Sequence, residues 1–401
     1  MNKSLDALSP FIPSDDALNN SDLADKATAL IAGSSKLSGQ LHPKALETLE
    51  CYMRVINSYY SNLIEGNATR PHEVRAAQRG EYSKDSAKRD LQLESLAHIA
   101  TQTWIREFNP DMKQVFSTEF ISEVHRRFYE ALPEHMWVIH NKEGELAGEV
   151  VPGQWRTGDV VVGQHVPIPG MQVPDAMQHF CNVYDPTRYK GDRRLIAVAA
   201  AHHRFVWIHP FADGNGRVVR LMTDAALKAA GLDSYGAWCL SRGLARSPIN
   251  YKTYLHNADQ VRQGNYDGRG PLTEKGLVAF CDYMLDTAID QVGYISGLLE
   301  IYGLRDRIDG YVQARNDGRV RGMGKLKPVA ATVLYTAFIQ GEISRAQAIE
   351  LTGMAERSAS RLLSELKADG LLSDTSNKSP LRWEIPEHAE PWYFPGLAPL
   401  G

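Results

Sequence analysis

The sequence predicts a mainly helical protein with one small β-hairpin and a C-terminal helix-turn-helix module that ends in two short strands. Through most of the 401 residues, apolar side chains recur at spacings of three and four, the period of a helix that buries one face. One stretch rich in β-branched residues and glycines interrupts this pattern and indicates strands. Because the chain is too long for one compact core of ordinary size, we expect two or three domains.

Two helices are predicted near the N-terminus. The first 30 or so residues mix Ser, Asp, Asn and Pro, and predict a loose arm or a short packing segment. Apolar residues at helical spacing predict a helix from Pro43 to Glu65, which Gly66 and Asn67 would end. The same spacing predicts a second helix from Arg89 to Glu107.

The middle of the chain predicts four helices and the β segment. A capping pattern at Ser117 predicts a helix through Phe128. The β-branched stretch within Gly144 to Pro169 predicts a β-hairpin or two short strands. Helical patterns resume in three segments: Val173 to Tyr184, Leu195 to Ile208 and Val218 to Ala230.

The C-terminal third predicts two helices, a linker and a separate module. Helices are expected near Tyr251 to Gln263 and Thr273 to Tyr302, and the glycine-rich, charged segment Asp317 to Gly324 is a candidate linker. The module beyond it has the order of a winged helix-turn-helix. Its expected elements are Lys327 to Ile339, a helix capped by Ser344, Met354 to Lys367, and strands at 370–372 and 382–385.

Composition restricts the classes of function. The formal net charge of -4 gives no global basic field for nucleic acid or anionic membrane. The chain has no basic, apolar leader, and its most apolar stretch, 195–208, is too short to span a bilayer. We therefore expect a cytoplasmic protein. The cysteines are far apart and form no CxxC pair, so we expect buried side chains rather than zinc ligands or disulfides. They are Cys51, Cys181, Cys239 and Cys281.

The most informative segment is HPFADGNGRVVR, residues 209–220. Pro210 would end the preceding apolar helix. Gly214 and Gly216, on either side of Asn215, allow a tight turn whose amides can bind an anion. The helix expected to begin near Arg217 adds unpaired N–H groups and a partial positive charge. Together these features predict a phosphate-binding turn.

Charged side chains in the same segment suit a bound polyphosphate. Arg217 and Arg220 lie three residues apart on one helix face, so both guanidinium groups can hold phosphates. Asp213 offers one carboxylate, and one carboxylate with phosphate oxygens is a usual ligand set for Mg²⁺. His209 can accept a proton near neutral pH. The alternative is a glycine-rich turn with incidental charges, but so many groups suited to one chemistry favour a site.

The segment resembles the Fic family motif, HxFxDGNGRxxR, at every specified position, and the similarity extends over about 110–310. The resemblance implies a helical Fic core that transfers AMP from ATP to a Ser, Thr or Tyr hydroxyl of a target protein, itself included. It implies that His209 is the general base, that Phe211 anchors the loop and that Asp213 holds Mg²⁺. It assigns phosphate binding to Gly214, Asn215, Gly216, Arg217 and Arg220.

A flap over the active site is also implied by the resemblance. The stretch Val151 to Pro169 lies where the family places a hairpin that can hold the target segment by main-chain pairing. Gln154, Arg156 and Gly163 resemble positions of that flap. The alternative is that the hairpin only covers core.

An inhibitory element is implied at residues 61–66, which read SNLIEG. Ser61, Glu65 and Gly66 match the family's inhibitory motif, (S/T)xxxE(G/N). Ser61 and Glu65 are four residues apart, so they face the same side of the predicted helix. The resemblance implies that Glu65 pairs with Arg220 and keeps ATP in an unproductive pose. Because the motif is short, an ordinary glutamate at a helix end is the alternative.

The C-terminal module resembles one found in many bacterial Fic proteins. Residues 325–401 contain 8 Lys and Arg against 9 Asp and Glu, a weak electrostatic footprint for DNA. A role in protein contact or packing is therefore favoured over DNA binding. The expected division is an N-terminal helical region with the inhibitory helix (1–110), the Fic catalytic core (111–316) and the winged-helix-like domain (325–390).

Two other functions stay open at this point. One is a nucleotide-sensing transcriptional regulator that acts through the winged helix, although a sensor has no need of a base at His209. The other is transfer of a different phosphate-bearing group. We expect packing or supporting histidines at His125, His202 and His203, since no zinc spacing is present. The sequence leaves open the target, the signal that releases Glu65, removal of AMP, and formation of a homodimer.

Overall fold

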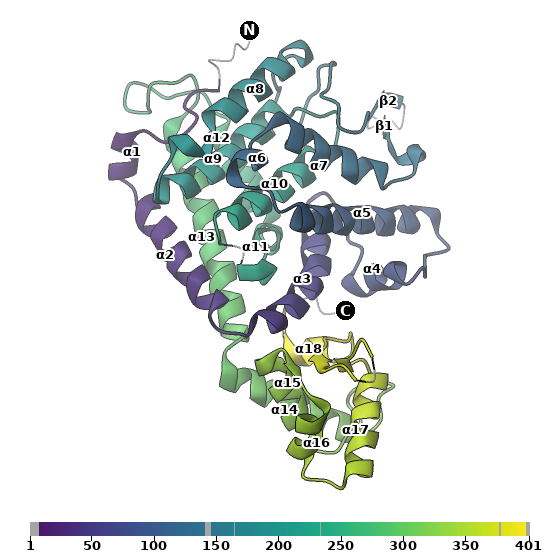
Figure 1. Cartoon of the computed structure of the whole chain (residues 1–401). Coiled ribbons are helices and arrows are strands. Elements are labelled where there is room, and N and C mark those ends of the chain that lie inside the picture. Colours follow the sequence, from purple (N-terminus) through teal and green to yellow (C-terminus); the bar gives the residue numbers. More distant parts are fainter. Residues whose placement is uncertain (1–7, 141–145, 164, 233, 377, 398–401) are drawn as a thin grey trace. The chain divides into compact units, whose positions relative to one another are not determined.

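The structure is a computed structural model that describes residues 8–140, 146–163, 165–232, 234–376 and 378–397, and it is mainly helical (Figure 1). The chain divides into two compact units. The first comprises Met1–Gly33, Asn57–Asp233 and Cys239–Gln291. The second comprises Ser34–Ile56, Ser234–Trp238 and Val292–Gly401.

The elements follow this division in chain order. Those of the first unit are α1 (Asp15–Asn19), α4 (Pro71–Gln78), α5 (Ser86–Phe108), α6 (Met112–Val115), α7 (Thr118–Glu130), β1 (Val138–His140), β2 (Leu146–Glu149), α8 (Val173–Val183), α9 (Asp192–Ile208), α10 (Asn215–Ala229), α11 (Leu240–Arg246) and α12 (Pro248–Ala258). Those of the second unit are α14 (Ile301–Asn316), α15 (Ala330–Gln340), β3 (Glu342–Ile343), α16 (Arg345–Thr352), α17 (Glu356–Ala368), β4 (Leu372–Ser373), β5 (Leu381–Trp383) and α18 (Glu390–Tyr393). Residues of both units belong to α2 (Leu23–Ser38), α3 (Pro43–Ile64) and α13 (Glu274–Leu298). Short 3-10 turns occur at Glu134–Met136, Gly170–Gln172, Pro186–Arg188 and Ser234–Gly236.

Helices α9 and α10 form the centre of the first unit. All side chains from Leu195 to Phe205 are buried, those of His202, His203 and Arg204 included, and α9 packs between α8 and α10. On its other sides α10 packs against α5, α6 and α7. The turn that joins α9 to α10, which contains the motif identified in the sequence, is therefore supported by several helices.

Most predicted helices are confirmed. The segments predicted from Pro43, Arg89, Val173 and Leu195 are α3, α5, α8 and α9, with starting residues that differ by at most three. The capped helix is α7, in which the hydroxyl of Ser117 accepts the amide of Phe120. The helix predicted from Val218 begins earlier, at Asn215, because Gly214 adopts the left-handed conformation (φ 78°) and serves as its N-cap.

Of the two alternatives expected for the first 30 or so residues, the described part forms a packing segment and not a loose arm. Residues 15–38 form α1 and α2. Leu23, Ala27, Leu30 and Leu37 are buried at helical spacing on α2. Ser, Asp and Thr residues between these positions weaken the apolar pattern, so burial against the rest of the chain decides the structure here.

The predicted position of the β-hairpin is only partly right, because β2 lies within 144–169 but β1 precedes that stretch. The strand pair is formed by β1 and β2, antiparallel, with Val138 opposite Glu149 and Ile139 opposite Gly148. In the expected stretch 151–169 the described residues form loops, with one isolated antiparallel bridge between Val162 and His165. Gly144, where the prediction began, lies outside the described residues. The β-branched composition indicated extended backbone but did not place the strands.

The long helix predicted from Thr273 to Tyr302 is two helices. It breaks between α13 and α14, where Glu300 leaves the helical conformation and its carboxylate accepts the amide of Gly303. The helix predicted to end at Gln263 is α12, which ends at Ala258.

Residues 330–383 of the second unit contain three helices and a small sheet. Here α15, α16 and α17 correspond to the three predicted helices, and Ser344 caps α16 by accepting the amide of Gln347. Both predicted strands are present as β4 and β5, and a third strand, β3, was not expected. The antiparallel order is β3-β5-β4. Trp383 of β5 packs edge-on against Phe338 of α15 and ties the sheet to the helices.

Two predictions from composition can be compared with the structure. Cys181, Cys239 and Cys281 are buried as expected, but Cys51 is exposed on α3, which corrects the prediction for that residue. None of the helices in the described part of the chain has both the length and the apolar character that crossing a membrane requires.

Candidate functional site

The turn between α9 and α10 has an unusual backbone. His209 ends α9 with a left-handed conformation (φ 51°, ψ 64°), which is uncommon for a residue that is not glycine. Its amide donates to the carbonyl of Phe205 at 3.0 Å, and Pro210 then prevents the helix from continuing. The chain therefore turns sharply and presents the His209 side chain at the end of a buried helix.

Asn215 fixes the shape of this turn. Its Oδ1 accepts the amide of Phe211 and its Nδ2 donates to the carbonyl of Phe211, both at 2.9 Å. Asn215 is only 2% exposed, so these bonds satisfy buried polar groups on both residues. Because α10 begins at Asn215, this residue and Gly216 contribute amides at the helix N-terminus.

Aromatic rings pack against Phe211 of the turn. Phe211 is fully buried and stacks on His125, with ring centroids 3.8 Å apart. Trp155 lies against the same phenyl ring at 4.7 Å. His125 of α7 also accepts the amide of Gly153 through Nδ1 at 2.8 Å. These contacts agree with the anchoring expected of Phe211 and the supporting role expected of His125.

His209 is held as a neutral imidazole. Burial lowers its pKa to about 4, although a hydrogen bond with the carbonyl of Val206 acts in the opposite direction. Electrostatic interactions with Arg156 and His165 lower the pKa further. At neutral pH the side chain can therefore accept a proton.

Asp213 is held in the ionised form by its neighbours. Its Oδ2 accepts the phenol of Tyr129 at 2.5 Å and lies 3.3 Å from a guanidinium nitrogen of Arg217. Burial alone would raise the pKa of Asp213, but the charge of Arg217, the bond from Tyr129 and the amide of Gly214 lower it. The side chain is still 55% exposed, so the carboxylate is accessible to a cation.

Arg217 lies between two carboxylates. One guanidinium nitrogen is 3.3 Å from Asp213 and the other is 3.3 Å from Glu94 of α5, while the guanidinium also stacks over the ring of Phe128 at 4.7 Å. Glu94 therefore faces the turn from α5.

Arg220 is almost fully buried and is bound by the end of α3. Its Nη2 donates to Glu65 Oε1 at 2.7 Å and to the carbonyl of Ser61 at 2.9 Å, and its Nε donates to the hydroxyl of Ser61 at 2.9 Å. Burial alone would raise the pKa of Glu65, but the charges of Arg220 and Arg217 lower it below the usual value. Glu65 is thus ionised, and its hydrogen bond with Arg220 is charge-assisted and short.

The Glu65 carboxylate also lies directly over Gly216. A Cβ atom added to Gly216 would come within 2.1 Å of Glu65 Oε1, so only glycine accommodates the carboxylate here. Gly66, directly after Glu65, has φ 95° and ends α3. The loop amide expected to face phosphate is covered by a side chain from a segment more than 150 residues away in sequence.

A pocket of about 480 Å³ opens beside the turn. Its volume is within the range of small-molecule sites. The lining brings together four of the residues predicted from the motif and the inhibitory segment, together with Gly163 of the expected flap. It comprises Ile64, Glu65, Val162, Gly163, His165, Val206, His209, Gly216, Arg220, Tyr251, Lys252, Leu255, His256 and Asp259.

The other expected flap residues lie in different environments. Arg156 is buried and donates to the carbonyls of His209 (2.7 Å), Ile168 (2.7 Å), Gly158 (2.9 Å) and Ile208 (3.1 Å). It is a brace that fastens the 156–168 segment to the end of α9. Gln154 is exposed. A contact of Gln154, Arg156 or Gly163 with a target stays a prediction.

Two residues of the site were missed in the sequence. Tyr129 and Glu94 bind Asp213 and Arg217, respectively, from α7 and α5. Tyr129 follows His125 by four residues, so the two share a helix face, and this spacing was the signal available for Tyr129. Nothing local indicates Glu94, because its partner is more than 120 residues away in sequence.

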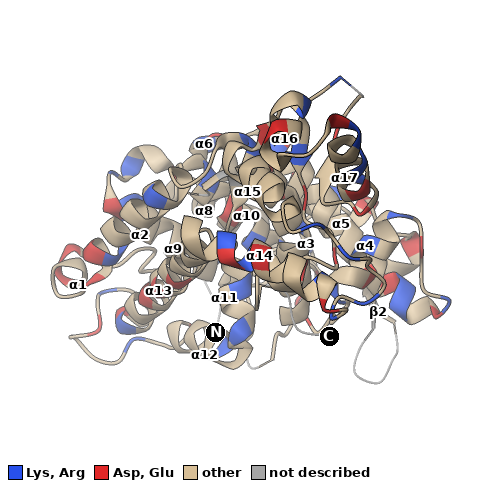
Figure 2. Cartoon of the chain, turned by 90° about the horizontal axis from the view of Figure 1, so that it is seen from below, with Lys and Arg blue, Asp and Glu red and all other residues tan. Residues whose placement is uncertain are grey.

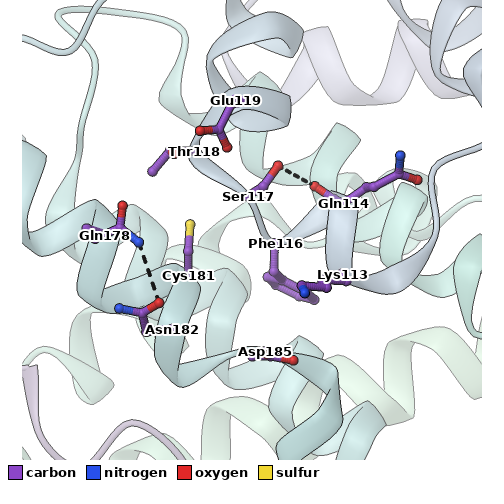
Figure 3. Close-up of a pocket in the computed structure, with 10 residues that line it drawn as sticks. All are labelled: Lys113, Gln114, Phe116, Ser117, Thr118, Glu119, Gln178, Cys181, Asn182 and Asp185. Carbon is purple, nitrogen blue, oxygen red and sulfur yellow. Dashed lines mark hydrogen bonds between the residues drawn. The ribbon is translucent and has the colours of Figure 1, made fainter.

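A second pocket, of about 330 Å³, lies between the start of α7 and α8 (Figure 3). Ser117 and Cys181 are among its lining residues, and burial raises the pKa of the Cys181 thiol to about 12. None of the lining residues belongs to the 209–220 turn. This pocket is therefore distinct from the candidate site.

Comparison with known proteins points to the same segment. The model of the Fic/DOC family matches residues 115–227. The protein adenylyltransferase Fic of Aedes aegypti is 28% identical over 198 residues, which cover 47% of this chain and 34% of that protein. The protein of the same name from Nematostella vectensis is 32% identical over 97 residues, which cover 23% of this chain and 22% of that protein. The chain therefore spans about a third or less of the length of these relatives.

Solved structures share the fold. A Fic family protein from Desulfovibrio desulfuricans G20 has a TM-score of 0.52 at 19% identity, covering 90% of this chain and 96% of that one. A Fic domain containing signaling protein from Bacteroides thetaiotaomicron VPI-5482 has a TM-score of 0.51 at 20% identity, covering 68% and 95%. At these identities the likeness concerns the fold, and the predicted mainly helical Fic fold is confirmed.

Proposed function

Because residues 115–227 of this chain form a Fic/DOC family domain, we propose that it is a protein adenylyltransferase, which transfers AMP from ATP to a hydroxyl side chain of a target protein. One observation carries this proposal. A neutral imidazole at the end of α9, a glycine-rich helix N-terminus and the guanidinium group of Arg220 line one pocket. These three groups can, respectively, accept the proton of a hydroxyl, bind the phosphate that is attacked and hold the rest of a polyphosphate.

Each part of the pocket has a role in the reaction. The amides at Gly214, Asn215 and Gly216 would bind the α-phosphate, since they lie at the N-terminus of α10. Arg217 and Arg220 would hold the β- and γ-phosphates. His209 would accept the proton of the attacking hydroxyl, which its low pKa permits at neutral pH. The bond between the α-phosphorus and pyrophosphate then breaks.

Asp213 would hold Mg²⁺ together with the phosphates. Its carboxylate is ionised and 55% exposed, and one carboxylate is sufficient when phosphate oxygens supply further ligands. Within the described residues no group of three or more His, Cys, Asp or Glu could hold a metal on its own. The ion would neutralise phosphate charge during the transfer.

Glu65 would inhibit the reaction. Its carboxylate accepts a hydrogen bond from Arg220 and lies against Gly216. Both residues are needed to bind the phosphates. ATP can then bind productively only after the end of α3 moves away. Ser61 adds two hydrogen bonds that keep Arg220 turned toward α3.

The flanking parts would serve recognition. The segment 151–169 borders the pocket at Val162, Gly163 and His165, so an extended target chain could pair with it. The C-terminal elements would form a winged helix that contacts protein rather than DNA. Acidic and basic residues are mixed on α17 (Figure 2), so the helix is not uniformly positive. The helix bears Glu356, Glu365, Arg357, Arg361 and Lys367.

Labelling with ATP carrying a marked α-phosphate tests the function. We expect Glu65→Gly to label itself at least about tenfold faster than the wild type, since a shift of only ~1.4 kcal/mol has that effect. Adding His209→Ala to Glu65→Gly should abolish labelling because the base is lost. Glu81→Gly is the matched control, since Glu81 pairs with Arg79 at 3.2 Å outside the pocket.

Three results would contradict the proposal. If Glu65→Gly transfers no label to itself or to any protein of a lysate, the transferase function fails. If His209→Ala leaves transfer unchanged, the role of the base fails. If Glu81→Gly raises labelling as much as Glu65→Gly does, the inhibitory contact is not specific.

A further inference from the structure

One aromatic side chain of the first unit is presented to solvent without covering any core. Tyr266 is 95% exposed, and among the exposed apolar and aromatic side chains of the described residues it is the most exposed. It lies in the loop between α12 and α13, which is closed by an antiparallel bridge between Val261 and Leu272. This loop is light green in Figure 1.

The loop that carries Tyr266 is firmly built. Asp267, the next residue, is 2% exposed and accepts three hydrogen bonds, from the amides of Gln263 and Lys275 (both 2.8 Å) and from the hydroxyl of Thr273 (2.9 Å). Burial alone would raise the pKa of Asp267, but these bonds lower it. Because Asp267 points inward and fixes the turn, its neighbour Tyr266 is held outward.

An acceptor in the proposed reaction has three requirements. It needs a hydroxyl, it must be long enough to bring that hydroxyl to His209 inside the pocket, and its backbone must leave room to enter another protein. Tyr266 has a phenol, the longest of the hydroxyl side chains, and it lies in a turn rather than in a helix. Tyr302, which is 79% exposed, is part of α14, and Tyr82 is only 44% exposed.

Tyr266 cannot serve its own active site in this conformation. Neither Tyr266 nor any other residue of the Val261–Leu272 loop lines the pocket that contains His209. A side chain exposed at 95% makes almost no contact with its own chain. An AMP group on Tyr266 would therefore come from the pocket of a second copy.

We infer that Tyr266 is an acceptor for adenylylation by a second copy of this chain. The inference rests on the proposed function. The phenol oxygen of Tyr266 attacks the α-phosphorus of ATP and forms a new P–O bond, while the bond to pyrophosphate breaks. The phenol proton passes to His209 of the copy that holds the ATP, and pyrophosphate leaves with the electron pair of the broken bond.

Peptide mass mapping of self-labelled protein tests the inference. After incubation of Glu65→Gly with ATP and Mg²⁺, we expect the mass of one AMP group on the peptide that contains Tyr266. Glu65→Gly with Tyr266→Phe should lose most of the self-label. Glu65→Gly with Tyr302→Phe is the matched control and should keep its label, because Tyr302 is exposed on a helix.

Mixing two variants tests transfer between copies. His209→Ala protein, which has an intact Tyr266 but no base, should become labelled when mixed with the Glu65→Gly, Tyr266→Phe enzyme. The inference is overturned if the label on Glu65→Gly maps to other residues, if Tyr266→Phe leaves self-labelling unchanged, or if the His209→Ala acceptor stays unlabelled while lysate proteins are modified. If Glu65→Gly labels nothing at all, the proposed function itself fails.

Discussion

At the residue scale, the site depends on bonds that orient charged groups before any ligand arrives. Burial and the negative charge of Asp213 raise the pKa of Tyr129 well above its usual value, so the phenol keeps its proton and donates it to that carboxylate. Tyr129→Phe removes this bond and lets the carboxylate rotate. Because Asp213 is half-exposed and water can replace the phenol, we expect a loss of roughly 1 kcal/mol in the free energy of unfolding.

When Tyr129→Phe is added to the Glu65→Gly variant, we expect the rate of transfer to fall more than the affinity for ATP. The orientation of the Asp213 carboxylate matters most in the transition state, where charge develops on the phosphates. Measuring kcat and KM for ATP checks this. Tyr189→Phe removes a similar hydrogen bond, to the carbonyl of Val183 at 2.9 Å, away from the pocket, and should leave both constants unchanged. Equal kinetic effects of the two substitutions would contradict the role given to Tyr129.

At the element scale, the end of α3 lies against the N-terminal turn of α10, where Glu65 contacts Arg220. The shape of the α10 terminus depends on Asn215. In Asn215→Ala the amide and carbonyl of Phe211 stay buried without partners, so we expect the free energy of unfolding to fall by roughly 2 to 4 kcal/mol. Chemical denaturation measures this loss. Asn182→Ala, on the exposed side of α8, should change the stability by no more than about 0.5 kcal/mol.

At the scale of the whole molecule, buried histidines make the first unit sensitive to acid. Burial lowers the pKa of His98 and His202 to about 3, and that of His125 and His209 to about 4. Unfolded histidines have a pKa of about 6.5, so between pH 6.5 and 4 the unfolded chain binds more protons than the folded one. Stability must therefore fall as pH falls, by at most about 1.4 kcal/mol per pH unit for each imidazole.

We expect the denaturation midpoint to be clearly lower at pH 5 than at pH 7, and nearly equal at pH 7 and pH 8, where imidazoles are neutral in both states. Equal midpoints at pH 5 and 7 would show that these four side chains are not buried as neutral groups.

How much the sequence predicts depends on how local the signal is. The turn from His209 to Arg220 is contiguous, and its geometry follows largely from Pro210 and the glycines, so the presence of a turn between two helices could be predicted. Tyr129 and Glu94 could not, because each meets its partner across more than 80 residues of chain. The contact of Glu65 with Arg220 is equally distant and entered only through the resemblance to a family.

Errors in the fold have similar causes. The two strands β1 and β2 are only three and four residues long, too short for a periodic pattern, while the β-branched residues after them form loops braced by Arg156. On α2 the apolar residues are separated by polar ones, and only burial reveals their common face.

The position of Glu65 against Gly216 has a consequence for how the molecule responds to nucleotide. If carboxylate and phosphate cannot share that space, occupancy is governed by the fraction of molecules in which α3 has withdrawn, and the apparent dissociation constant exceeds the intrinsic one by the reciprocal of that fraction. A partner that binds the withdrawn helix would then tighten nucleotide binding without touching the pocket. By reciprocity, saturating nucleotide would raise the affinity of the chain for that partner by an equal factor.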